Sequence, residues 1–432
     1  MSDWRPPKFE RPRLNFARGG APDPYRRALL RSGFLGLGLF ASGGWLAGCG
    51  HGFNDESGAS GDPNAETPLQ SQIPSLGPLQ PTPDANGLRL PEGFTSRVVA
   101  RSGLKPLDAS NYFWHTAPDG GAVFATEDGG WIYVSNSERS FPNGGVGALR
   151  FSADGEIIDA YSILEGTNRN CAGGLTPWGT WLSCEEDFFG GRGRVIECDP
   201  TGSAEPVFLP RMGLFVHEAV AVDPATHQIY ETEDRSDGGF YRFTPADPQP
   251  GGRPDLRSGT LEIAVVENLA SVLAGSTSTV SWEIIPDPFA NPVSTRRQVA
   301  GRASFRGGEG IWYADARVYF STKRDRNIWV YDIAAASLSL LYGAMSFEPD
   351  NVAVSPGGDV LVAEDGGGMQ LVAITPEGQL VELVQVVGHN RSEIAGPAFD
   401  PSGTRLYFSS QRGATGSSSS GVTYEISGPF VA

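Results

Sequence analysis

The feature that most constrains the fold is a loose repeat of short strands, which runs from about residue 89 to the end of the chain. Each copy opens on a glycine-rich or acidic loop, enters a short apolar stretch, turns at glycine or aspartate, and leaves through a second apolar stretch. In the first copy, the turn is expected at Asp119-Gly120-Gly121. Self-similar units of this kind predict a repeat architecture. The copies are 114–138, 170–186, 218–235, 309–323, 350–365 and 397–410.

Most copies continue into an outer pair of strands, as at 239–243, 327–332 and 370–374. Four short strands per unit, repeated six times around an axis, predict an all-β fold, a six-bladed β-propeller with a central channel. The stretch 94–100 is expected to pair into the last blade and close the ring. A β-sandwich is the alternative, but it would not need six copies of one unit.

In a propeller the innermost strand of each blade lines the channel, so its start and the end of the next strand gather at one mouth. An acid at any one of these places is better explained as a solvated loop residue. Several acids around one axis repel each other strongly unless cations neutralise them, so the set predicts a metal cluster in the channel. Oxygen ligands favour Ca²⁺, and a thiolate suggests a transition metal such as iron. The candidate ligands are Cys171, Glu186, Glu218, Glu233, Glu309, Asp350 and Glu364.

The net charge of −17 argues against a nucleic-acid partner, which requires a basic face. It agrees with carboxylates held together by divalent cations. The chain has only five histidines, which argues against an imidazole-rich zinc site.

The N-terminus has the features of an export signal, and residues 1–49 are expected to form a twin-arginine (Tat) lipoprotein signal. Arg26-Arg27 precedes a short apolar run at 34–46, and Leu46-Ala47-Gly48-Cys49 resembles a lipobox with Cys49 as the lipidated residue. An uncleaved N-terminal anchor is the alternative. Residues 50–88 are polar and are expected to be a disordered linker, and 89–432 form the propeller. This organisation predicts a periplasmic or outer-membrane-anchored monomer that contacts the membrane through its lipid.

Several stretches resemble the PhoX-type alkaline phosphatases, and the similarity covers about residues 89–432. The longest is Asn-Cys-Ala-Gly-Gly-Leu-Thr-Pro-Trp-Gly-Thr-Trp-Leu-Ser-Cys-Glu-Glu at 170–186. Shorter ones are His-Glu-Ala-Val-Ala-Val-Asp-Pro at 217–224, Thr-Glu-Asp-Arg-Ser-Asp-Gly-Gly-Phe-Tyr-Arg-Phe at 232–243, Gly-Glu-Gly at 308–310 and Pro-Asp-Asn-Val-Ala-Val-Ser-Pro at 349–356. The resemblance implies a Tat-exported propeller with two ferric ions bridged by the motif cysteine and with calcium ions on the channel axis.

Carried over residue by residue, the resemblance makes Cys171 the bridging thiolate. It makes Glu186, Glu218 and Glu309 iron ligands, and Glu233, Asp350 and Glu364 calcium ligands. Arg306 and Arg235 are the expected catalytic residues that hold phosphate oxygens, with Lys323 and Arg324 nearby; ion pairs with neighbouring acids are the alternative for each. Two departures from the family are the shorter chain and the altered spacing of Arg306 before Gly308-Glu309.

The expected function is therefore hydrolysis of a small phosphomonoester at an iron and calcium cluster. The alternatives are a lactonase-like calcium propeller and a non-catalytic surface propeller with structural metals. Cys184 and Cys198 are either joined by a disulfide across a hairpin or remain free thiols packed in the sheet.

Overall fold

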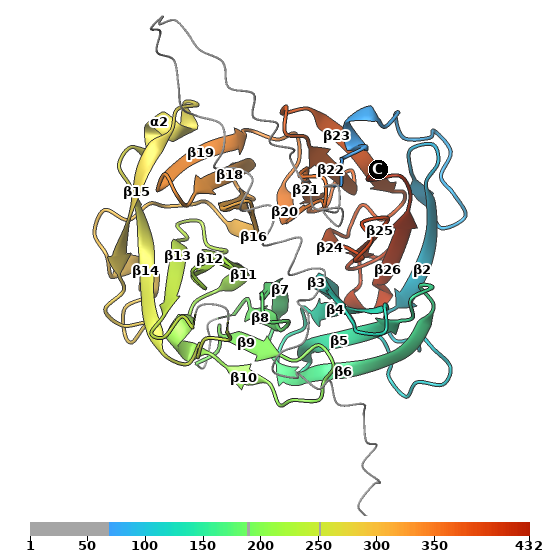
Figure 1. The fold of residues 1–432 in the computed structure, drawn as a ribbon, viewed down its shortest axis with the longest axis horizontal. Coiled ribbons are helices and arrows are strands. Elements are labelled where there is room, and N and C mark those ends of the chain that lie inside the picture. Colours follow the sequence, from blue (N-terminus) through green and yellow to red (C-terminus); the bar gives the residue numbers. More distant parts are fainter. Residues whose placement is uncertain (1–68, 188–190, 250–251) are drawn as a thin grey trace, which may run out of the picture.

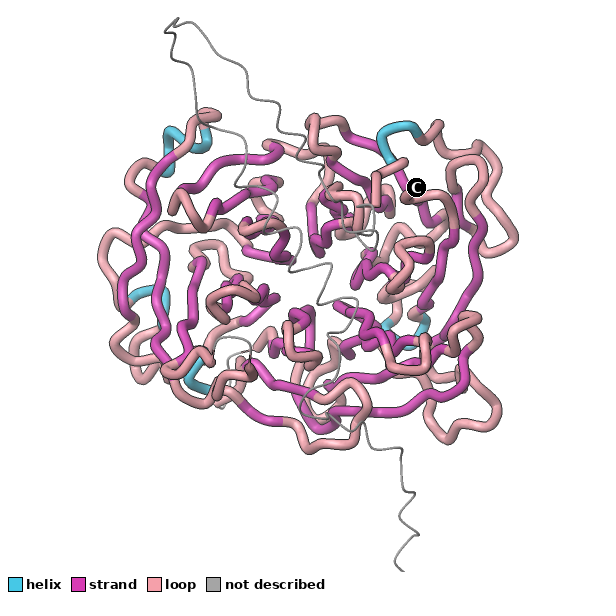
Figure 2. The backbone as a smooth tube through the Cα atoms, viewed as in Figure 1, coloured by secondary structure: helices cyan, strands magenta, loops and turns pink. Residues whose placement is uncertain are grey.

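The computed structural model describes residues 69–187, 191–249 and 252–432, which form a β-propeller around a central axis (Figure 1). The region between the inner strands is called the channel below. Antiparallel strands and turns make up nearly all of it, and the helical segments are short (Figure 2). The predicted all-β propeller is confirmed. The predicted signal segment, with Cys49, lies outside the described residues.

Six units follow one another along the chain, and the first strand of each lies next to the channel. The first unit contains β3 (Pro118–Ala125), β4 (Trp131–Ser137), β5 (Gly144–Phe151) and β6 (Ile157–Thr167). The second contains β7 (Asn170–Leu175), β8 (Trp181–Glu185), β9 (Val195–Cys198) and β10 (Val207–Phe208). The third contains β11 (His217–Val222), β12 (Ile229–Glu233), β13 (Phe240–Pro245) and β14 (Gly259–Val266), followed by β15 (Ser278–Ile284).

The other three units have the same order of strands. The fourth contains β16 (Gly308–Ala314), β17 (Arg317–Thr322), β18 (Asn327–Asp332) and β19 (Ser337–Tyr342). The fifth contains β20 (Pro349–Val354), β21 (Val360–Glu364), β22 (Gln370–Ile374) and β23 (Leu380–Val386), with β1 (Leu88–Arg89) at its edge. The sixth contains β24 (Ile394–Phe399), β25 (Arg405–Ser410), β26 (Val422–Ser427) and β2 (Thr95–Arg101). The helical segments are α2 (Leu269–Leu273), η1 (Ile73–Ser75), η2 (Pro210–Met212), η3 (Thr295–Arg297) and η4 (Ser418–Ser420).

Hydrogen bonding divides these strands into five sheets, because β15 joins the third and fourth units into one nine-stranded sheet. The link is short: Ser278 pairs with Leu338 and Thr279 with Ser337. The inner strands form a closed ring in which β3, β7, β11, β16, β20 and β24 each contact the next, and β24 contacts β3.

The ring is closed by a strand from the N-terminal side of the propeller. β2 pairs along the outer edge of β26, with Thr95 opposite Ser427 and Arg101 opposite Val422. The predicted closure by residues 94–100 is therefore confirmed. Because this strand comes before the first unit in the sequence, the two ends of the propeller are held in one sheet.

The segment 69–88 differs from the prediction, which assigned it to a disordered linker. Ile73 is fully buried among residues of the fifth and sixth units. Backbone hydrogen bonds join Gln72 to Phe430 at 2.8 Å and Ala432 to Gln70 at 2.9 Å. A few apolar side chains and an unpaired sheet edge are enough to order a polar segment, which is why composition alone misplaced this boundary.

The core lies between neighbouring units, since both faces of most inner strands are covered. The second strands β4 and β12 are buried at every position, and in β12 the buried Glu231 and Glu233 are hydrogen-bonded to His217 and Tyr241. Phe240 of the third unit stacks on Phe320 of the fourth with ring centroids 4.6 Å apart. Each fully buried aromatic side chain contributes roughly 1.5–3 kcal/mol, so this packing fixes the position of one unit against the next.

The pairing of β8 with β9 excludes the disulfide considered for Cys184 and Cys198. In the structure Cys184 pairs with Val195, and Cys198 pairs with Trp181. The two thiols are buried in different apolar clusters, and both are free. The disulfide required Cys184 directly opposite Cys198, and a register shifted by three residues removes that contact.

None of the helices in the described residues is long and apolar enough to cross a bilayer.

Candidate metal centre

A β-bulge near the start of the inner strands turns one side chain toward the channel. In β3, β7, β11, β16 and β20, the ladder register breaks between the first and fourth residues of the strand. Such a bulge inserts one residue and redirects its side chain. The second residues of these strands are Asp119, Cys171, Glu218, Glu309 and Asp350.

The sixth inner strand, β24, has the same break in register but has no ligand at the corresponding position. The break lies between Ala395 and Ala398, and Gly396 adopts a φ of +64°. The N–H of Gly396 donates to Oδ1 of Asn351 at 2.6 Å, while Nδ2 of Asn351 donates to Asp350 at 3.0 Å. The acid of this unit is Glu393, directly before the strand.

Small residues beside the bulges let the inner strands approach closely. A Cβ on Gly120 would lie 2.4 Å from Cα of Ala172, and one on Gly310 would lie 2.4 Å from the backbone nitrogen of Val352. Neither position accepts a larger residue without movement of the neighbouring backbone. This close approach brings side chains from different units within reach of one ion.

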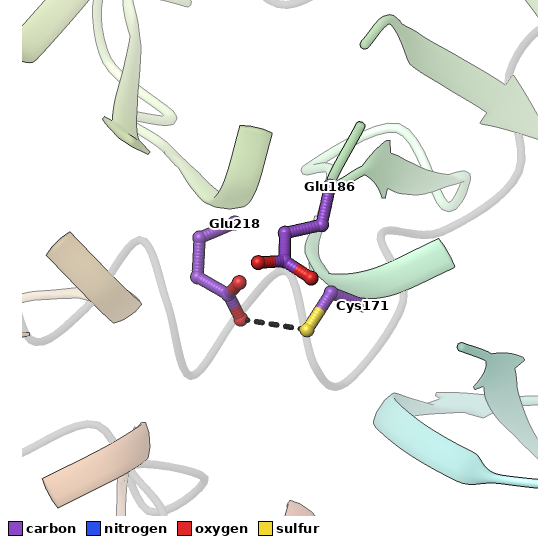
Figure 3. Close-up of side chains that lie close together, drawn as sticks. All are labelled: Cys171, Glu186 and Glu218. Atoms are coloured by element: carbon purple, nitrogen blue, oxygen red, sulfur yellow. Dashed lines mark hydrogen bonds between the residues drawn. The ribbon is translucent and has the colours of Figure 1, made fainter. Parts of the chain in front are cut away.

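Cys171, Glu186 and Glu218 form the first group of candidate ligands, and Figure 3 shows their side chains converging. The thiol of Cys171 donates to Oε1 of Glu218 at 3.1 Å, and it lies 3.8 Å from Oδ2 of Asp119. One potential ligand atom from each member lies within 4.8 Å of the others. A sulfur and two carboxylates at this spacing suit a transition-metal ion.

Two further groups contain only carboxylates. Glu218, Glu309 and Asp350 form one, so that Glu218 is shared with the group around Cys171. Asp119, Glu138 and Glu393 form the other. Sets of oxygen ligands are the environment that hard ions such as Ca²⁺ prefer.

Burial and mutual repulsion raise the pKa values of these groups. Burial raises the pKa of Asp350 to about 7 and that of Glu186 to about 8, the latter with a contribution from Glu138 and Asp234. Burial and then neighbouring carboxylates raise the pKa of Glu218 and that of Asp119 well above the usual range. Desolvation does the same to the pKa of the Cys171 thiol.

The donor set fits a mixed cluster of cations. Buried carboxylates and a thiol with raised pKa values resist ionisation by themselves, and bound cations reverse that balance. The fit rests on the combination of one sulfur with several oxygens from different units. This combination suits a cluster that contains both iron and calcium.

Two predicted ligands, Glu233 and Glu364, lie outside these groups and bond within their own units. Glu233 accepts from Tyr241 at 2.8 Å and from the Gly239 N–H at 3.0 Å, and pairs with Arg296 at 2.9 Å. Glu364 accepts from the N–H groups of Gly368 and Gln370.

Glu233 and Glu364 each lie one residue before the position that faces the channel. Successive side chains in a strand point to opposite sides, so the last residue of the second strand faces its own blade. The residue after it faces the channel, as Glu186 does. The corresponding residues in the six units are Glu138, Glu186, Asp234, Lys323, Asp365 and Gln411.

Three acids of these groups are not among the ligands predicted from the sequence: Asp119, Glu138 and Glu393. Asp119-Gly120-Gly121 suggested a turn, but these residues lie in β3 and the turn follows at 126–130. Aligning the first two repeats, so that Asp119 corresponds to Cys171 and Glu138 to Glu186, would have identified two of the three acids. Glu393 has no such signal, because Gly396 occupies the bulge of its unit.

His217, next to Glu218, points away from the channel. Its Nε2 lies 2.8 Å from Oε2 of Glu231, its Nδ1 lies 2.9 Å from the Gly193 carbonyl, and its ring stacks on Phe215. It therefore ties β11 both to β12 of its own unit and to the β8–β9 loop of the second unit.

The predicted catalytic arginines, Arg235 and Arg306, lie on adjoining loops at the channel mouth. The Arg235 carbonyl accepts from the N–H of Gly307 at 2.8 Å, and the Arg306 carbonyl accepts from the N–H of Arg324 at 3.0 Å. Both side chains are exposed, so neither lies among the buried acids.

Two other basic residues do lie among the acids. Nζ of Lys323 is 3.1 Å from Glu309 and 3.0 Å from Asp365. Arg412 pairs with Glu393 at 3.2 Å and lies 3.9 Å from Glu138. These side chains supply positive charge at the mouth from the protein itself.

Solved structures of similar fold include a phosphatase. PhoX from Pseudomonas fluorescens, in complex with vanadate, a transition state analogue, has a TM-score of 0.64 and 15% identity, over 84% of this chain and 98% of that chain. A gluconolactonase from Xanthomonas campestris reaches a TM-score of 0.47 and 14% identity, over 84% and 96% of the two chains. No curated protein sequence gives a significant match.

The sequence also matches the model of the family described as alkaline phosphatase PhoX. The match covers residues 130–337 and 342–413, which is more than half of the chain. It includes the second to sixth inner strands, with Cys171, Glu218, Glu309 and Asp350. The chain belongs to the PhoX alkaline phosphatase family.

Proposed function

We propose that this protein is a metal-dependent phosphoesterase that hydrolyses phosphomonoesters at an iron and calcium cluster in the channel mouth. The observation that carries the proposal is the repeated bulge position, which turns one thiol and four carboxylates from successive units toward one axis. Membership of the PhoX family supports it.

Bound cations would supply the concentrated positive charge that a phosphate ester dianion needs for binding and for stabilisation of its transition state. The chain's own residues would hold them: Cys171, Glu186 and Glu218 at the sulfur-containing end, and Glu309 and Asp350 beside it. Asn351 orients Asp350 through its amide. Burial of these acids excludes water, so the charges act in a medium of low dielectric constant.

The basic residues at the mouth have a separate task. Arg235, Arg306 and Arg324 lie on connected loops, where guanidinium groups can hold phosphate oxygens as the ester enters. Lys323 and Arg412, which already pair with acids, favour the ionised form of Glu309 and Glu393 and so oppose the burial that raises the pKa values of these carboxyl groups.

The decisive experiment combines metal analysis with turnover. The purified full-length protein should contain iron and calcium, and it should hydrolyse p-nitrophenyl phosphate in a manner that a chelator abolishes and added metals restore. A simple lactone serves as the control substrate. Calcium without iron, together with lactone cleavage or with no turnover, would instead support a lactonase-like or non-catalytic calcium propeller.

We also propose that the chain is exported by the Tat route and anchored through Cys49 as a monomer. Arg26-Arg27, the apolar run and the lipobox-like Leu46-Ala47-Gly48-Cys49 support this. Replacing Arg26 and Arg27 with lysine should block export, and Cys49→Ala should abolish labelling by a fatty-acid analogue. Normal export of the dilysine variant would contradict the Tat assignment.

A further inference from the structure

The two ends of the propeller differ in charge. The end opposite the channel mouth, here called the far face, is formed by the turns after the first and third strands of each unit, such as 126–130 and 400–404. Most of these turns contain aspartate or glutamate. Among their described residues, the only lysine or arginine side chains are those of Arg253 and Arg257, both of which are paired with acids.

The mouth loops, in contrast, contain most of the basic residues of the propeller, mixed with acids. Among the described residues, charge is therefore unevenly distributed, and acidic side chains outnumber basic ones most strongly in the far-face turns. An anionic surface would attract the mouth and repel the far face.

Exposed phenylalanines add an apolar element to the mouth. Phe113 lies in the loop between β2 and β3 and is 58% exposed, and Phe141 lies between β4 and β5 and is 51% exposed. Phe289, 42% exposed, follows Pro288, whose carbonyl accepts from Leu214 close to the start of β11. Large apolar residues exposed near the far-face turns include Ile158, Ile284, Leu380 and Leu69. One aromatic residue, Phe208, is 43% exposed on β10 after the turn at 199–206, at the outer edge of the second unit.

Each of the three phenylalanines at the mouth has a cationic side chain over its ring. Arg192 lies 3.7 Å from the ring centroid of Phe141, Arg211 lies 5.5 Å from that of Phe289, and Lys105 lies 5.7 Å from that of Phe113. A cation over an aromatic ring is stabilised by the ring quadrupole, and the pair presents an apolar side chain and a positive charge together. This combination is typical of surfaces that seat at the boundary between lipid headgroups and acyl chains.

We propose that the mouth face is an interfacial surface that seats on an anionic phospholipid bilayer. The three aromatic and basic pairs come from separate loops around the channel, an arrangement that suits a fluid, extended surface. The phenylalanines enter the headgroup region while the three basic residues pair with lipid phosphates. The acidic far face then points away from the bilayer, and the channel opens toward phosphoesters held at the membrane surface.

Vesicle flotation tests this without measuring turnover, so its outcome is independent of the proposed activity. The full chain with Cys49→Ala, which removes the predicted acyl anchor, is mixed with phosphatidylcholine vesicles that contain or lack phosphatidylglycerol. Binding should require phosphatidylglycerol and should fall when salt rises from about 0.1 M to about 0.5 M, since screening shortens the range of attraction.

Three triple variants, two at the mouth and one at the far face, separate the two ends of the propeller. Phe113→Ser/Phe141→Ser/Phe289→Ser should weaken binding about tenfold or more, through loss of inserted apolar area. The matched control, Ile158→Ser/Ile284→Ser/Leu380→Ser, changes equally exposed residues at the other end and should bind normally. Lys105→Ala/Arg192→Ala/Arg211→Ala should lose roughly fivefold per residue.

Circular dichroism and thermal melting confirm that each variant is folded before it is compared. Equal binding to neutral vesicles, an equal loss in the phenylalanine variant and its Ile158/Ile284/Leu380 control, or no binding at all would overturn the proposal. A dimer or filament in sedimentation that the mouth variant alone abolishes would also overturn it, because the occupant of the face would then be the acidic end of a second copy.

Discussion

The sulfur of Cys171 on β7 lies 3.1 Å from Oε1 of Glu218 on β11, although the two residues belong to different units of the propeller. Burial and the neighbouring Asp119 and Glu218 carboxylates raise the pKa of this thiol, which disfavours a free thiolate. A bound cation would reverse that preference, so metal binding at this contact would favour the thiolate form of Cys171.

Cys171→Ser should remove iron, visible colour and phosphatase activity together, because serine is a poor replacement for a bridging thiolate. Metal content per chain and the absorption spectrum provide the measurement. Cys198→Ala, which alters a buried thiol away from the channel, is the control and should retain its metals. A Cys171→Ser protein that keeps its iron would refute the assignment of this residue.

Glu218→Gln and Glu233→Gln should have opposite consequences. The first removes a ligand shared by two groups and should lower metal content with little loss of fold in the metal-free protein. The second leaves Arg296 without its carboxylate partner and should lower the free energy of unfolding by about 1–3 kcal/mol, while metal content stays normal. Denaturant titration and metal analysis of both variants decide between ligand and structural roles.

The stability of the metal-free protein should fall as pH rises. Asp350 has a pKa of about 7 and Glu186 of about 8 in the folded chain, against about 4 when unfolded. A carboxyl group whose pKa is raised by folding adds stability below its unfolded pKa, and loses that contribution as pH rises through the folded value.

The loss should therefore occur between about pH 4 and about pH 8, and metal-loaded protein should show much less of it, because bound cations favour the ionised acids. Thermal midpoints of stripped and loaded protein across this range provide the comparison. A stripped protein that is most stable at about pH 9 would show that these acids are already neutralised by other groups.

Lys323→Met should destabilise the metal-free protein by a few degrees in its thermal midpoint, since Glu309 and Asp365 lose the ammonium group between them. Added Ca²⁺ should restore more of the midpoint in this variant than in the parent. Arg324→Met, on the neighbouring and more exposed side chain, is the matched control. Equal responses of the two variants to Ca²⁺ would argue against a charge-balancing role for Lys323.

Arg306→Ala should lower kcat/KM for p-nitrophenyl phosphate by roughly tenfold or more, because a charge-assisted contact to phosphate is lost. Arg253→Ala makes the same change at the far face, where the side chain pairs with Glu197, and should leave turnover unaltered. Free phosphate should inhibit the Arg306 variant more weakly than the parent. Identical kinetics for both variants would remove Arg306 from the substrate site.

The sequence alone was sufficient for the propeller, because six copies of one apolar and acidic unit leave few other ways to bury their surfaces. It was also sufficient for Cys171, Glu186, Glu218, Glu309 and Asp350 as residues that converge, since each occupies a recognisable place in its repeat. The closing strand at 95–101 followed from the same reasoning.

Only the tertiary structure decided which of two adjacent residues faces the channel. Glu233 and Asp234 are equally acidic in the sequence, but the pleat of β12 turns the first toward Tyr241 and Arg296 and leaves the second at the mouth. The register of β8 and β9 likewise separated Cys184 from Cys198, and the packing of Ile73 ordered a segment that is polar by composition. In each case the outcome depends on contacts between residues distant in sequence, and a shift of even one residue in a strand exchanges its inner and outer faces.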